Sequence, residues 1–207
     1  MKYSKEAHAA LEKIDKIAGE NQSILKRISQ GDDWSFIIKC IALTESTLNR
    51  ALVSQTKSDA FEKIFSRLSI SAKINMAYEL GLFTSKYERM FLEYLVVLRN
   101  KLAHDPNEID FSFQEYFSKM TTQEVNNFKN HMRIDNEEKD DEYYAFIFKH
   151  PKDGIWILLN SILAVFVFKQ ELNKVEKIFD FEPEDYGVTL LTGLVDKQIS
   201  KKIKEDQ

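Results

Sequence analysis

The sequence predicts an all-α fold on three observations. Apolar residues recur three and four positions apart along nearly all of the 207 residues. Only 6 glycines and 3 prolines are present, which is too few for a turn-rich β protein. Serine and threonine capping signals precede several of the periodic segments. With 43% apolar and 30% charged residues, the composition is that of a folded globular chain and excludes wholesale disorder.

Four helices are predicted in the first half of the chain from the spacing of their apolar residues. They cover about residues 5–29, 33–53, 58–66 and 69–80. Gly31 ends the first of them, and Asp33 offers an N-cap for the second. Gly81 follows the fourth at the position where a left-handed C-cap is expected, a conformation that glycine adopts readily.

The next predicted helix has the clearest end signals. Ser85 and Glu88 have the spacing of a capping box, in which each side chain satisfies a free backbone amide. Pro106 disfavours helical geometry at Asp105, so the helix should end near His104. Its buried face is marked by Phe91, Leu95, Leu98 and Leu102.

The half of the chain after Pro106 is also expected to be helical for the most part. Thr121 and Glu124 form a second capping box, which opens a helix to about Arg133. Two aromatic segments are ambiguous, and the second of them could be strand or helix: 111–117 and 143–148. The remaining expectations are an acidic loop over 136–142, a strongly apolar helix over 153–179 and an amphipathic helix over 184–204.

The whole chain, 1–207, is interpreted as one α-helical domain in the cytoplasm. No internal repeat or low-complexity linker divides it. The long apolar run Ile155–Phe168 is shorter than the roughly 20 residues of a membrane span, so it predicts a buried core helix and no membrane association. The N-terminal segment lacks the apolar core of a signal peptide, and a single cysteine, Cys40, excludes an intrachain disulfide.

Most catalytic signatures are absent from the sequence. The glycines are scattered singly, so there is no phosphate-binding loop, and the four histidines are far apart. We therefore expect no metal site and no cofactor. Cys40 stands beside Ile41 on an apolar helical face, which favours a buried thiol over a nucleophile. The net charge of −4 excludes a protein that wraps nucleic acid with its whole surface.

One cluster at a predicted helix end has the residue types of phosphodiester chemistry. Arg99, Asn100 and His104 supply a guanidinium, an amide and an imidazole within six residues. Asn100 and His104 share a helix face, and Arg99 lies about 100° round from Asn100. Such a histidine can transfer protons while the arginine stabilises charge that develops on a phosphate. The alternative is that Arg99 and His104 only cap the helix by bonding its free carbonyls.

Residues Leu98–His104 resemble the Arg-polar-x(3–5)-His signature of the HEPN superfamily (higher eukaryotes and prokaryotes nucleotide-binding domains). The longer stretch Ile70–Pro106 resembles the mannitol-operon-repressor branch of that superfamily. Members of the branch carry an Ala-Tyr-x-Leu-Gly-Leu helix end, here Ala77–Leu82, before a helix that closes in Arg-Asn-x-x-Ala-His. Thr44–Leu48 is similar to the acidic position of the same branch.

The resemblance covers about residues 33–106, and Leu102 stands where an aromatic residue is common. It implies a HEPN-like helical bundle, which in this chain carries an additional helical C-terminal half. Packing helices would extend to about residue 180, and 183–207 would form a C-terminal helix or tail. The half after Pro106 matches no family that we can name.

The resemblance also implies a homodimer in which the motifs of both protomers face one cleft, and metal-independent cleavage of RNA. Arg99 would then neutralise the scissile phosphate, His104 would act as acid or base, and Asn100 would orient one of them. Lys101 would contact the RNA. Glu45 would orient Arg99 across the bundle, or else it is an exposed helix acid.

Two functions of different class follow. The first is a dimeric endoribonuclease of a toxin–antitoxin or phage-defence system, with an antitoxin as partner. The second is a non-catalytic regulator like the mannitol operon repressors, acting through a regulatory protein partner or nucleic acid. No helix-turn-helix with a basic recognition helix is evident, and the lysine-rich segment 197–204 is more typical of a solvated helix end.

Overall fold

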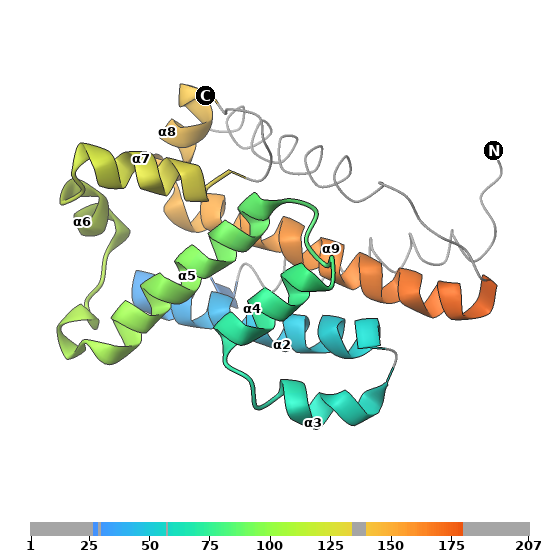
Figure 1. The fold of residues 1–207 in the computed structure, drawn as a ribbon. Coiled ribbons are helices and arrows are strands. Elements are labelled where there is room, and N and C mark those ends of the chain that lie inside the picture. The colour runs from blue at the N-terminus through green and yellow to red at the C-terminus, as the bar shows by residue number, and fades with distance from the viewer. Residues whose placement is uncertain (1–26, 29, 57, 134–139, 180–207) are drawn as a thin grey trace.

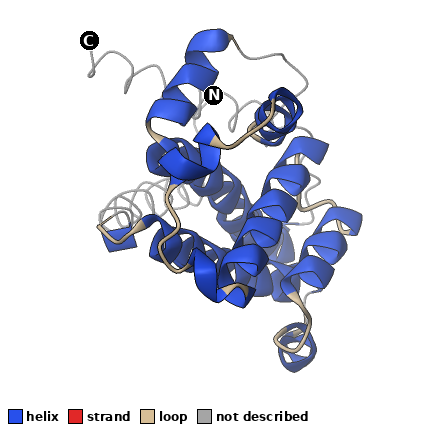
Figure 2. Cartoon of the chain, turned by 90° about the vertical axis from the view of Figure 1, so that its left-hand side faces the viewer, coloured by secondary structure: helices blue, strands red, loops and turns tan. Residues whose placement is uncertain are grey.

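The computed structural model describes residues 27–28, 30–56, 58–133 and 140–179. All regular elements in these ranges are helices, which confirms the all-α fold class (Figures 1 and 2). In chain order they are α2 (Asp33–Thr56), the 3-10 helix η1 (Asp59–Phe61), α3 (Glu62–Phe65), α4 (Ile70–Glu79), α5 (Lys86–His104), the 3-10 helix η2 (Pro106–Glu108), α6 (Phe113–Ser118), α7 (Thr122–His131), α8 (Asp141–Lys149) and α9 (Pro151–Phe179).

Helices α2 and α9 lie side by side along the centre of the fold, and α4 and α5 pack against α2 (Figure 1). At the start of both helices, Lys152 forms an ion pair of 2.8 Å with Asp33. Towards their other ends, Asn173 donates a hydrogen bond of 2.9 Å to Gln55. The two helices therefore run parallel, and the elements between them return the chain to its starting end.

A single core joins the first and second halves of the chain. Its fully buried side chains come from α2, α4, α5, α6, α7, α8 and α9, among them Phe36, Leu48, Ile74, Phe91, Phe128, Leu158 and Phe166. The segment Pro151–Asn173 is long and apolar enough to cross a membrane, but 56% of its most apolar stretch is buried inside the protein. Most of the segment Ile155–Phe168 is buried in the core, which confirms its predicted burial.

Several helix ends lie where the sequence predicts them. Ser69 caps α4 by accepting a hydrogen bond of 3.2 Å from the Ala72 amide, and Gly81 follows that helix with a φ of 67°. Thr121 and Glu124 form the complete capping box expected at the start of α7. These local signals act without help from the rest of the fold, because each involves residues only a few positions apart.

The secondary structure of two other segments could not be predicted from local sequence signals. The ambiguous aromatic segment 111–117 overlaps α6, and the segment 143–148 lies within α8, so the strand alternative for the second is wrong. Of the helix expected over 5–29, only residues 27 and 28 lie in a described helical turn. The helix expected over 184–204, the tail 183–207 and most of the acidic loop lie outside the described residues.

At the start of α5, Ser85 caps the helix as predicted, and the Glu88 carboxylate also binds the residue before the cap, Thr84. The Ser85 hydroxyl accepts from the amides of Tyr87 and Glu88 at 3.2 and 3.4 Å, as predicted. The Glu88 carboxylate, however, accepts from both the backbone amide of Thr84 (3.0 Å) and its hydroxyl. Glu88 is fully buried, and this burial raises its pKa although the bonds from Thr84 and the charge of Lys169 act in the opposite direction.

Stability is expected to depend on the ionisation of Glu88. A carboxyl with a raised folded-state pKa favours folding while it is protonated, so stability is lost as the pH rises above its ordinary value of 4.5. The melting temperature of Glu88→Gln, relative to wild type, should therefore rise between pH 4.5 and 8. Thermal denaturation at several pH values measures this difference.

Glu115 is the matched control, because its ion pair with Lys119 lowers its pKa. The corresponding difference for Glu115→Gln should not rise over the same pH range. A pH-independent difference for Glu88→Gln would contradict the role assigned to this carboxyl.

Candidate functional site

The expected catalytic residues lie at the C-terminal end of α5, which is anchored to α2. The helix ends at His104, as predicted, because Asp105 before Pro106 adopts an extended conformation with φ of −107° and ψ of 111°. The indole Nε1 of Trp34, in the first turn of α2, donates a hydrogen bond of 2.9 Å to the Leu102 carbonyl. This bond satisfies one of the free carbonyls and fixes the helix end in place.

The side chains of the motif are available for a ligand. Arg99 is half-buried, whereas Asn100 and His104 are exposed. Within the described part of the chain, none of the three forms a side-chain hydrogen bond or ion pair. Arg99 and His104 therefore do not bond the last carbonyls of α5 here, which weakens the alternative in which they are helix caps.

The backbone positions of Arg99 and His104 diverge around the axis of α5. At about 100° per residue, their positions on α5 differ by about 140° around the helix axis, whereas Asn100 and His104 differ by about 40°. The face that carries Asn100 and His104 also carries Val97, whose residue is 67% exposed. Ile109, just beyond η2, is 68% exposed. Polar motif residues flanked by exposed apolar ones are consistent with a face that meets another chain.

Lys101 lies on a different flank of α5 from Arg99. Its Nζ forms an ion pair of 2.8 Å with Glu108 and lies 5.7 Å from the centre of the Tyr116 ring. The bond to Glu108 raises the pKa of Lys101, so the ammonium stays protonated at neutral pH. Lys101, which the resemblance implies would contact RNA, is therefore part of a pocket between α5, α6 and α7.

Glu45 has another partner than the one expected. Its carboxylate accepts a 2.6 Å bond from Nζ of Lys73 on α4, and no hydrogen bond or ion pair to Arg99 is present among the described residues. Helix α4 packs on α2 and places this fully buried ammonium next to Glu45, which retains 37% side-chain exposure. The expectation that Glu45 orients Arg99 is not supported by this geometry, and its pairing with Lys73 corrects it.

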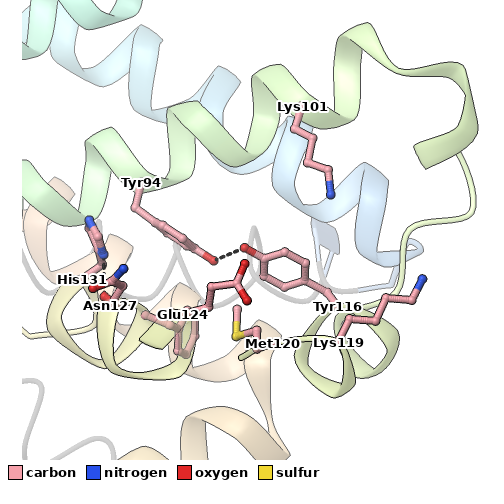
Figure 3. A pocket seen from close by; sticks show the side chains of 9 residues that line it. Tyr94, Lys101, Tyr116, Lys119, Met120, Glu124, Asn127 and His131 are labelled. Atoms are coloured by element: carbon pink, nitrogen blue, oxygen red, sulfur yellow. Dashed lines mark hydrogen bonds between the residues drawn. The ribbon is translucent and has the colours of Figure 1, made fainter. Parts of the chain in front are cut away.

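The pocket beside Lys101 was not found from the sequence (Figure 3). It has a volume of about 320 Å³ and receives side chains from three helices and the turn between α6 and α7. The lining residues are Tyr94, Lys101, Tyr116, Lys119, Met120, Glu124, Asn127, Phe128 and His131. The four aromatic residues within Phe111–Phe117 indicate that this segment packs against other parts of the protein, but the pattern does not predict a cavity.

Cys40 is a buried thiol, as predicted. The residue is fully buried on α2, and burial raises the pKa of its thiol to about 12, so it is not a thiolate at neutral pH. Across the described ranges, no three His, Cys, Asp or Glu side chains come close enough to hold a metal ion.

Comparison with known proteins adds no relative. No family model, no curated protein and no solved structure matches this chain. The resemblance to the HEPN superfamily therefore depends on the motif residues of the sequence and on a fold class that many proteins share.

Proposed function

We propose that this protein is a HEPN-type, metal-independent endoribonuclease that acts as a homodimer. The observation that carries the proposal is the state of Arg99, Asn100 and His104. All three stand at the anchored end of α5, and none of them forms a side-chain hydrogen bond or ion pair with another described residue. Unpaired polar groups of this kind are not required to end the helix. A cytoplasmic toxin–antitoxin or phage-defence system, with an antitoxin as partner, is the setting that we infer for such an enzyme.

The proposed reaction is attack of a ribose 2′-hydroxyl on the adjacent phosphate. His104 takes the proton of the hydroxyl or gives one to the leaving 5′-oxygen, and the products are a 2′,3′-cyclic phosphate and a free 5′-hydroxyl. Arg99 stabilises the negative charge on the phosphate, and Asn100 orients one of the two. Since Arg99 and His104 diverge on one helix, we propose that each site combines Arg99 of one protomer with His104 of its partner.

RNA cleavage in EDTA tests the proposal. We expect His104→Ala and Arg99→Ala each to reduce the cleavage rate about 100-fold, the scale of a lost acid–base group. Arg67→Ala, at an exposed arginine outside α5, is the matched control and should cleave like the wild type. Product ends are identified by their resistance to ligation and by mass spectrometry.

Mixing the two inactive variants tests the composite site. If each site draws on both protomers, mixed dimers of Arg99→Ala and His104→Ala contain one intact site, so activity should return in part. No return of activity would contradict the shared site while leaving cleavage itself intact. No cleavage by the wild type would contradict the nuclease.

The second candidate is a regulator without catalysis that acts through protein binding. The observation that favours it is the exposure of Val97 and Ile109 beside the motif, since exposed apolar side chains of this size mark many protein-binding surfaces. In that case Arg99 and His104 contribute to partner recognition, and no cleavage depends on them.

A further inference from the structure

Trp34 supplies a hydrogen bond that Pro106 cannot provide at the last turn of α5. In a helix that continued, the Leu102 carbonyl would accept from the amide of residue 106, but proline has no N–H. The indole Nε1 of Trp34 donates to this carbonyl instead, at 2.9 Å. The bond therefore holds the peptide group that joins Leu102 to Ala103, one residue before His104.

The motif side chains depend on this turn for their direction. Arg99, Asn100 and His104 form no side-chain hydrogen bond or ion pair with another described residue. The backbone of the last turn therefore decides where they point. Helix ends fray, and fraying of α5 would displace His104 first, because it is the last residue of the helix. A bond that opposes fraying acts directly on the proposed acid–base group.

The turn that carries Trp34 is itself held by its neighbour Asp33. One carboxylate oxygen of Asp33 pairs with Lys152 of α9 at 2.8 Å, and the other accepts from the Phe113 amide at 2.9 Å. This amide is the first of α6, whose own N-cap, Ser112, makes no side-chain bond to the helix. The first turn of α2 is thus tied to α6 and α9, so the second half of the chain supports the motif in the first half.

We propose that Trp34 is a positioning residue of the endoribonuclease, whose indole N–H holds the last turn of α5 in the orientation in which His104 transfers protons. The inference rests on the proposed function, because it assigns Trp34 a role in that reaction. Trp34 acts through the Leu102 carbonyl and does not contact the reacting atoms. Since a misplacement of about 1 Å can slow a reaction about 100-fold, loss of the bond should affect kcat.

RNA cleavage kinetics in EDTA test this role with two replacements at position 34. Trp34→Phe removes the donor and part of the ring, whereas benzothienylalanine keeps the shape of the indole and has sulfur in place of the N–H. We expect each replacement to lower kcat about 10-fold and to leave KM unchanged. Ser35→Ala is the matched control, because it removes only the 2.8 Å bond from the Ser35 hydroxyl to Asp32 in the same turn, so kcat should stay that of the wild type.

Amide hydrogen exchange gives a second readout, which does not depend on RNA. Loss of the indole donor should speed exchange at Ala103 and His104 about 10-fold, since the last turn of α5 then frays more often. Exchange at Leu92, in the first half of the same helix and fully buried, should stay unchanged. A general loss of stability would speed exchange at Leu92 as well.

The outcomes separate this role from the proposed function. If the wild type does not cleave RNA, both fail. If the wild type cleaves and the benzothienylalanine variant has the same kcat, only the role of Trp34 fails. A raised KM with unchanged kcat, an equal loss in Ser35→Ala or unchanged exchange at Ala103 would also overturn it. Because benzothienylalanine keeps the packing of the indole, the test is valid even if Trp34→Phe does not fold.

Discussion

Replacing Phe166 with alanine is expected to lower the free energy of unfolding by about 3–5 kcal/mol. Phe166 is fully buried on α9, and its ring lies 5.3 Å from that of Phe83 in an edge-to-face arrangement. Phe83 belongs to the connection between α4 and α5. The substitution therefore removes one of the contacts through which α9 packs on the motif-bearing half. Urea denaturation, followed by circular dichroism, gives the free energy.

Phe168 is the matched control, because it is on the same helix and only half-buried. Phe168→Ala should cost about 1–2 kcal/mol, in line with the smaller area that it buries. Both variants should unfold in one transition. Equal costs, or a second transition in Phe166→Ala alone, would contradict the interpretation of the described helices as one cooperative unit.

Replacing Glu45 with leucine is expected to lower the free energy of unfolding by about 3 kcal/mol. The ammonium of Lys73 is fully buried and is bonded to Glu45 at 2.6 Å, so the substitution leaves a positive charge in the interior without its partner. Removal of one member of a buried pair costs about 3–5 kcal/mol, and the one-third exposure of Glu45 places this case at the lower end.

The pair of Glu115 and Lys119 provides the comparison. Its bond is also 2.6 Å long, but the two side chains are 63% and 71% exposed. Glu115→Leu should therefore change the stability by less than about 1 kcal/mol. The double variant Glu45→Leu/Lys73→Met should regain most of the stability lost in Glu45→Leu, because both charges are then absent. If Glu45→Leu lowers the free energy of unfolding no more than Glu115→Leu does, burial does not make the pair of Glu45 and Lys73 more stabilising than an exposed pair.

The pairing of Glu45 with Lys73 predicts that Glu45 contributes to the stability of the fold and not to the proposed RNA cleavage. Because Glu45 contacts Lys73 and not Arg99, its substitution should act on folding rather than on RNA cleavage at the end of α5. Arg99 remains available to a phosphate without a positioning carboxylate from α2 among the described residues.

The helices and their ends were determined locally. Thr121 and Glu124 form the predicted capping box, Gly81 has the positive φ that a left-handed C-cap requires, and α5 ends before Pro106. Each of these signals operates between residues fewer than five positions apart, so no knowledge of the packing was needed. The same holds for the placement of the motif at a helix end, since its spacing and the following proline are both in the sequence.

The sequence by itself thus determined the all-α class, the start of α7, the ends of α4 and α5, and the placement of Arg99–His104 at a helix end. Only the tertiary structure decided that Glu45 pairs with Lys73, that Lys101 faces Tyr116, and that the segment around Tyr116 is a helix. Apolar periodicity tells which face of a helix is buried, but not which of several helices will cover it. The direction of a long polar side chain depends on that choice, because the charge nearest to it in space comes from a distant part of the chain.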